Sequence, residues 1–142
     1  MEMKLTKNFT LDEMCKSRTA RMKKISNSPS ITAIKNLTAL CENVLQPLRD
    51  YLGEPVIINS GYRCPFLNRL IGGANGSQHV LGEAADINCK GSLDYAKNVI
   101  IFIMEHCVFD QLILEKKKGT IWVHVSYTTT HKNRQQYLEL KK

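Results

Sequence analysis

Two histidines and one aspartate are the side chains of this 142-residue chain whose types and spacing could hold a catalytic metal ion. His79 and Asp86 are seven positions apart in a segment that contains a glycine, and His124 lies much later in an alternating run. Zinc binds imidazole nitrogen and carboxylate oxygen, and a catalytic zinc site uses three such protein ligands plus water. A histidine taken alone is more often structural than metal-binding. The combined pattern strengthens the interpretation of these three residues as ligands of one zinc ion.

We expect β-strands to position these residues, and four short runs in the sequence predict such strands. The runs cover residues 56–59, 85–88, 111–115 and 121–127. Alternation along the last run places Val123 and Val125 toward the core and Trp122 and His124 on the opposite face. An imidazole on the open face of a sheet is well placed to bind a metal ion.

Helices are expected on both sides of these strands. Thr10 and Glu13 form a capping-box pattern, which predicts a short helix over residues 11–16. The longest helix is predicted to start at Ser28 and Pro29 and to run to Gly53. Pro47 should kink that helix or loosen one of its turns.

Two further helices are expected, over residues 65–70 and 92–106, while residues 17–28 and 74–82 are predicted to be loops. Helices flanking a small, mostly antiparallel sheet define an α+β fold. The length fits a single domain over residues 1–142. It would comprise an N-terminal segment (1–28) with the short helix, the strands and helices described above, and a polar tail (128–142) whose structure is left open.

Residues 77–86 read SQHVLGEAAD and carry a resemblance to a known family. They are similar to the Ser-x-His-x-x-Gly-x-Ala-x-Asp signature of zinc D-Ala-D-Ala carboxypeptidases. That family includes D-alanyl-D-alanine dipeptidases and phage L-alanyl-D-glutamate endopeptidases, and its zinc fold is related to the hedgehog signalling domain. Residues 60–63 (SGYR) and 122–124 (WVH) resemble two further segments of the family, so the resemblance runs from about residue 56 to 127.

The resemblance implies roles for individual residues. His79, Asp86 and His124 would be the zinc ligands. Arg63 would contact the substrate carbonyl or carboxylate, a role that suits its planar set of donors. Ser77 would help to hold the substrate. Structural alternatives exist, and for Arg63 the alternative is a salt bridge that closes a loop.

We expect Gln78 to line the cleft as well, and Trp122 to form a platform beside the metal, although half-buried packing is the alternative for this tryptophan.

A general base is also needed, and here the chain departs from the family pattern. Many relatives have Glu or Asp three residues before the second histidine, where this chain has Ile121. If Lys118 and Gly119 form a two-residue hairpin turn, Glu115 faces Trp122 and becomes a diagonal neighbour of His124. The segment 109–115 also resembles the strand that carries a glutamate in the hedgehog signalling domain. Glu115 is therefore the predicted base, with a solvent-facing strand glutamate as the alternative.

Glu83 is the second candidate for the base, but we expect its side chain to point outward. It lies between His79 and Asp86 in the predicted loop.

Composition narrows the function classes. The net charge of +7 favours an anionic partner, such as cell-wall polymer, although a basic solvated surface would explain it equally well. No apolar run approaches the length of about 20 residues that a membrane helix needs, so no membrane insertion is expected. A nucleic-acid partner is not expected, because no basic stripe interleaved with aromatic residues occurs. The five cysteines include no Cys-x-x-Cys pair and are expected to be reduced.

The leading hypothesis is a zinc metallopeptidase that hydrolyses peptidoglycan stem peptides, acting at D-Ala-D-Ala ends or at L-Ala-D-Glu bonds. We expect a monomeric phage or prophage lysin, made in the cytoplasm without a signal peptide and acting on the wall after release, or a hydrolase carried by the virion. The alternative is a non-catalytic module of the same fold that keeps zinc for binding cell wall or protein, and Ile121 gives it weight.

Overall fold

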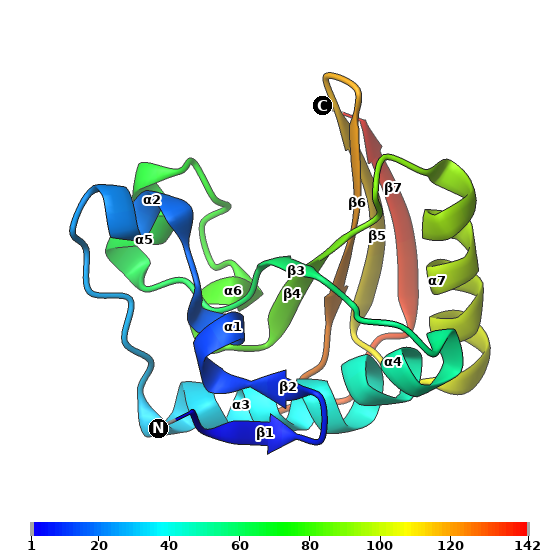
Figure 1. Cartoon of the computed structure of the whole chain (residues 1–142), viewed down its shortest axis with the longest axis horizontal. Helices are drawn as coiled ribbons and strands as arrows, with labels where there is room; N and C mark the ends of the chain where they lie inside the picture. Colours follow the sequence, from blue (N-terminus) through cyan, green and yellow to red (C-terminus); the bar gives the residue numbers. More distant parts are fainter. Residues whose placement is uncertain (1, 142) are drawn as a thin grey trace.

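A five-stranded sheet forms the centre of the chain (Figure 1). In the computed structural model, which describes residues 2–141, the spatial order of its strands is β3 (Ile58–Ser60), β4 (Ala84–Asn88), β6 (Thr120–Ser126), β5 (Gln111–Lys117) and β7 (Gln136–Lys141). Strands β3, β4, β6 and β5 pair antiparallel in turn, and β7 joins β5 in parallel. The α+β class is confirmed, and the parallel β7 makes the larger sheet mixed.

One face of this sheet is packed against helices. Helix α7 (Leu93–His106) lies along β5 and β6, and the run α3 (Ile31–Leu40), η1 (Cys41–Leu45) and α4 (Gln46–Leu52) crosses one end of the sheet (Figure 1). The sheet side chains in this core include Val123 and Val125, as the alternation predicted. Trp122 and His124 therefore lie on the other face, which is left available for a site.

The long helix contains one widened turn. Segment η1 is a π-helix, and the Gln46 amide donates to the Cys41 carbonyl five residues earlier. Pro47 follows directly, and its ring has no N–H to donate and would clash with the carbonyl of Asn43 in a regular helix. The wide turn relieves this conflict, which confirms the loosened turn predicted near Pro47. The helix begins later than predicted, because Ser30 rather than Ser28 is the N-cap.

The N-terminal segment is more structured than expected. Strands β1 (Lys4–Thr6) and β2 (Phe9–Thr10) form a small hairpin, followed by α1 (Leu11–Cys15). The predicted capping box of Thr10 and Glu13 is present, with both reciprocal hydrogen bonds formed. The predicted loop 17–28 is wrong in part, because it contains α2 (Arg18–Met22), a single helical turn capped by Ser17. A short polar helix of this kind leaves no apolar periodicity to read.

Two short helices flank the open face of the sheet. Helix α5 (Pro65–Leu70) is confirmed as predicted. Helix α6 (Gln78–Leu81) corrects the predicted loop 74–82. It ends at Gly82, which has φ of 76°, and a Cβ there would lie 2.5 Å from the carbonyl oxygen of Ala33. Glycine is therefore required at this position by both its conformation and its close contact with α3.

The cysteine side chains form no disulfide bonds among residues 2–141. All five cysteines are unpaired, as expected. Burial raises the pKa of Cys15, Cys89 and Cys107 to about 11 and that of Cys41 to about 12, so these thiols stay protonated at neutral pH.

Among residues 2–141, no helix has the length and apolar character needed to cross a lipid bilayer.

Candidate metal centre

Strand register brings two of the three predicted ligands together. Asp86 on β4 is directly opposite His124 on β6, and directly opposed side chains on neighbouring strands are about 4.5–5.5 Å apart at Cβ. Nδ1 of His124 lies 3.1 Å from Oδ1 of Asp86. The contact therefore follows from the pairing of two strands rather than from a flexible loop.

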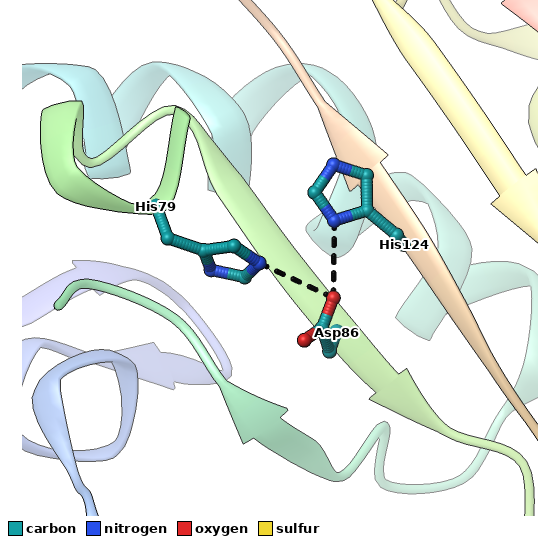
Figure 2. A group of neighbouring side chains, drawn as sticks. All are labelled: His79, Asp86 and His124. Carbon is teal, nitrogen blue, oxygen red and sulfur yellow. Dashed lines mark hydrogen bonds and ion pairs between the residues drawn. The ribbon is translucent and has the colours of Figure 1, made fainter. Parts of the chain in front are cut away.

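His79 reaches the same carboxylate from helix α6 (Figure 2). Its Nε2 lies 3.3 Å from Oδ1 of Asp86, and its Nδ1 lies 2.7 Å from the carbonyl oxygen of Gly61. A carbonyl can only accept, so Nδ1 donates its proton to Gly61, and Nε2 is the ring nitrogen that faces the site and carries a lone pair whenever the imidazole is neutral. This is the outer hydrogen bond that metal-binding histidines usually make.

The spacing of these atoms fits a zinc ion. One ligand atom from each of His79, Asp86 and His124 lies within 4.8 Å of the other two. Ligand atoms around a tetrahedral zinc ion, with bonds of about 2.0–2.1 Å, are about 3.3–3.5 Å apart. The separations of 3.1 and 3.3 Å between Asp86 Oδ1 and the two imidazole nitrogens are close to these values. Figure 2 shows all three side chains pointing toward one another.

The charge state of Asp86 also suits a cation. Burial alone would raise its pKa, but hydrogen bonds and electrostatic attraction from His124 and His79 outweigh burial and hold the pKa below its usual range. The carboxylate is therefore ionised at neutral pH, as a metal ligand must be.

Arg63 lies beside this cluster and is fixed by three neighbours. Its Nε donates to Ser60 Oγ at 3.0 Å, Nη1 donates to Asn68 Oδ1 at 3.0 Å, and Nη2 lies 3.4 Å from Asp86 Oδ2. Burial lowers the pKa of Arg63, while Asp86 and Glu115 act to raise it. The guanidinium is thus held beside the three predicted metal ligands and within the field of Glu115.

Glu115 occupies the position that the hairpin prediction gave it. Lys117 pairs with Thr120, Glu115 with Trp122 and Ile113 with His124, so the predicted register is confirmed. The Trp122 Nε1–H donates to Glu115 Oε2 at 3.2 Å, and the glutamate is only 7% exposed. The alternative of a solvent-facing glutamate is therefore wrong.

A cleft of about 430 Å³ lies over this face of the sheet and joins these residues. Its walls come from the segments before and after α5, from α6, and from strands β4, β5, β6 and β7. All eight residues predicted for the site line it. They are Arg63, Ser77, Gln78, His79, Asp86, Glu115, Trp122 and His124.

A match to a known protein family identifies the family of the chain that carries this cleft. A family model described as Peptidase M15 matches residues 7–126 of the chain, which is most of its length. The chain belongs to the peptidase M15 family. This confirms the resemblance read from the motifs and makes the chain a member of a zinc-dependent metallopeptidase family. No curated protein matches the chain.

The M15 match extends farther toward the N-terminus than the motifs did, since it begins at residue 7 and includes strand β2 and helices α1 to α4. It stops at the last residue of β6. Residues 127–141, including β7, therefore lie outside the region that the family model describes.

Two of the residues predicted to bind substrate also form hydrogen bonds within the protein. Ser77 caps α6, and its Oγ accepts from the amide of His79 at 3.2 Å. The amide group of Gln78 donates to Glu83 Oε1 and to Asp110 Oδ2, both at 3.1 Å. The Ser77 hydroxyl can still donate its proton, and the side-chain amide oxygen of Gln78 can still accept a hydrogen bond.

The expectation that Glu83 points outward is wrong. Its side chain is 3% exposed, and it accepts hydrogen bonds from Gln78 and from Thr128 Oγ1. Glu83 does not line the cleft, so it joins α6 to the segment after β6 and is no rival to Glu115 as a base.

Sequence reasoning missed two supports of the site. Asn68 is 5% exposed and bridges Arg63 to the Ala74 carbonyl. Arg134 is paired with the buried Asp110 and lines the cleft from the C-terminal segment. No local signal points to either, because each depends on a contact between segments that only the fold brings together. Gly61 did carry a signal, because it is part of the motif read at residues 60–63.

Proposed function

We propose that this chain is a zinc-dependent peptidase that hydrolyses peptidoglycan stem peptides, either at D-Ala-D-Ala ends or at internal L-Ala-D-Glu bonds. The observation that carries the proposal is the convergence of His79, Asp86 and His124 in a cleft that also contains an arginine and a buried glutamate. Membership of the M15 family supports peptide hydrolysis as the reaction.

In this proposal His79 Nε2, an Asp86 carboxylate oxygen and His124 Nδ1 hold one zinc ion. Such an ion polarises a carbonyl group and lowers the pKa of water toward about 7. His79 is kept in the correct tautomer by the Gly61 carbonyl. Asp86 is kept in place by Arg63 and by its partners on β6.

Glu115 is the proposed general base. Its carboxylate takes a proton from the attacking water and then gives it to the leaving amine, which requires both steps to occur within hydrogen-bond reach. The hydrogen bond from Trp122 fixes the orientation of the carboxylate in the cleft. Ile121 cannot serve this role, because its side chain packs against the core on the other face of β6.

Arg63 is the proposed electrophilic contact. A guanidinium held by Ser60 and Asn68 has little freedom to lose when it binds the carbonyl oxygen or a carboxylate of the substrate. Trp122 supplies a flat apolar wall for the peptide. The Ser77 hydroxyl and the Gln78 carbonyl oxygen contribute polar contacts from α6.

The biological setting is proposed on charge and chemistry. A net charge of +7 complements an anionic cell wall. We propose that the chain acts as a monomeric phage or prophage lysin, reaching the wall from the cytoplasm after release or as part of a virion.

Mass spectrometry of muropeptides tests the function. Purified peptidoglycan is digested with the protein, with and without a chelator, and the released peptides identify the bond that is cut. The proposal expects new peptide ends that disappear with the chelator and return when zinc is added. If the protein binds zinc but releases no peptide, the non-catalytic module is the correct function.

A further inference from the structure

The C-terminal segment builds a wall of the cleft that the family match does not include. Strand β7 pairs in parallel with β5 from Gln111 opposite Gln136 onward. Just before it, the amides of Gln135 and Gln136 donate to the carbonyls of Phe109 and Asp110, both at 3.0 Å. These bonds fix residues 134–136 against the start of β5, so Arg134 enters the cleft from a defined position.

Arg134 is anchored at this position by a buried carboxylate. Asp110 is 0% exposed, and it accepts from Arg134 Nε at 3.0 Å, Arg134 Nη2 at 2.7 Å, the Arg134 amide at 2.9 Å and Gln78 at 3.1 Å. Four donors occupy the lone pairs of that carboxylate. Asp110 therefore holds the arginine but has no further capacity to bind a ligand.

The rest of the guanidinium faces outward. The two side-chain bonds to Asp110 use Nε and Nη2, so Nη1 lies on the opposite side of the group, and half of the side chain is exposed. An arginine whose conformation is already fixed loses little freedom when it binds a second anion. It can present charge-assisted donors to a carboxylate in the cleft.

The charges that line the cleft support an anionic ligand at this end. Asp86 and Glu115 are the carboxylates among its lining residues, and both interact with Arg63. Gln111, next to the anchor of Arg134, is four residues from Glu115 along β5, which corresponds to about 13 Å. Arg134 thus adds a separate cationic contact at the start of β5, away from the base.

We propose that Arg134 is a specificity-determining residue that binds a carboxylate of the peptide substrate several ångströms from the scissile bond. This rests on the proposed peptidase function. The carboxylate belongs either to the C-terminus of the peptide or to a glutamate side chain, because both present the same planar pair of oxygens. The segment 127–141 would then set which peptides are accepted, while the residues within the family match perform the hydrolysis.

The test uses four matched stem-type peptides with a free or amidated C-terminus and with glutamate or glutamine. For the wild-type protein we expect kcat/KM about tenfold higher for the peptide with the critical carboxylate than for its neutral counterpart. In Arg134→Gln this preference should fall to about one, through KM. The modification that removes the preference in the wild type, at the C-terminus or at the side chain, identifies the carboxylate.

Lys132→Gln is the matched control, because it removes one positive charge from the same exposed segment outside the cleft. It should keep the wild-type preference. A preference unchanged in Arg134→Gln, an equal loss for acidic and neutral peptides, or no preference in the wild type would each overturn the proposal.

Two further measurements keep the outcome decisive. Arg134→Gln leaves the Asp110 carboxylate buried and unpaired, so this variant can fail to fold. In that case two other variants are compared, Asp110→Asn alone and Asp110→Asn combined with Arg134→Gln. The combined variant has no buried charge at this position. The single variant should keep a preference and the double variant should lose it, and a preference retained in the double variant refutes the role. Peptide affinity is also read from the fluorescence of Trp122, the only tryptophan, in a Glu115→Gln background. This separates failure of carboxylate binding from failure of hydrolysis.

Discussion

Two buried aspartates in the same region of the sheet differ in whether their neighbours can bind a metal ion. Asp86 on β4 and Asp110 before β5 are 9% and 0% exposed, and neighbouring groups hold the pKa of each below its usual range. Asp86 shares Oδ1 between two imidazoles and has the Arg63 guanidinium near Oδ2, whereas Asp110 is bound by a guanidinium, two amide donors and no histidine.

The identity of the partners explains the difference. An imidazole that loses or relocates a proton exposes a nitrogen lone pair, so His79, Asp86 and His124 can exchange their mutual contacts for bonds to a metal ion. A guanidinium or an amide N–H has no lone pair to offer. Asp110 is therefore a structural anchor for Arg134 and Gln78, although its burial and charge resemble those of Asp86.

The largest expected effect comes from breaking the Asp86 cluster. His124→Ala removes one of three ligands, so hydrolysis of stem peptides should fall to the level of a protein-free control, while the fold is kept. Peptide release followed by chromatography measures this, and circular dichroism reports the fold. His131→Ala, at an exposed histidine of the C-terminal segment, is the matched control and should retain wild-type activity. Substantial hydrolysis by His124→Ala would show that the cluster is not the catalytic centre.

The next effect concerns Glu115, the proposed base beside the cluster. Glu115→Gln keeps an oxygen that can accept from Trp122 but cannot take a proton, so kcat should fall by about 10²- to 10⁴-fold with zinc content unchanged. Steady-state kinetics and elemental analysis of the same sample check both parts. Glu105→Gln, on an exposed position of α7, should behave as the wild type. Equal activity of the two variants would remove Glu115 from the mechanism.

Breaking the Asp110 cluster should act on stability instead. Asp110→Ala leaves Arg134 and Gln78 without their acceptor, and we expect a loss of about 2–3 kcal/mol in the free energy of unfolding. Zinc affinity should be unchanged, because His79, Asp86 and His124 keep their own contacts. Urea unfolding and zinc titration measure the two quantities. A variant that loses zinc but not stability would reverse the roles assigned to the two aspartates.

The smallest effect is the dependence of stability on acid. The hydrogen bonds from Arg134 lower the pKa of Asp110 to about 2 from an ordinary value of 3.8. A group with a lowered pKa in the folded state contributes stability that is complete above the unfolded pKa and disappears as the pH falls through the folded value. Wild-type stability should therefore decline between about pH 4 and pH 2, and the decline should be shallower in Asp110→Asn. Urea unfolding across this range measures both slopes, and identical slopes would contradict the assignment.

The same contrast separates what the sequence could predict from what it could not. The alternation that orients His124 and the hairpin that pairs Glu115 with Trp122 are local patterns that follow strand and turn geometry. The motif around His79 acts differently, through its resemblance to a family signature. The structure confirms the predicted strand faces and the predicted hairpin register. These patterns predict the sheet face of His124 and Glu115, whereas the full set of ligands is implied by the resemblance to the family.

The C-terminal wall escaped prediction because it depends on distant contacts. Arg134 and Asp110 are 24 residues apart, and β7 pairs with β5 in parallel across an intervening strand and loop. A polar segment with weak alternation gives no sign of such a partner. The sequence therefore predicts only a polar tail over residues 128–142, although β7 occupies Gln136–Lys141. The local capping rule also fails at the start of the long helix, because Pro29 favours Ser28 as the N-cap, whereas the structure has Ser30 there.

Zinc titration of metal-free protein tests the central claim most directly. The account predicts that the wild-type chain binds one zinc ion per molecule, that Asp86→Ala does not bind zinc measurably, and that Asp110→Ala binds it as the wild type does. Equal zinc binding by Asp86→Ala and the wild type would contradict the claim that His79, Asp86 and His124 form the metal centre.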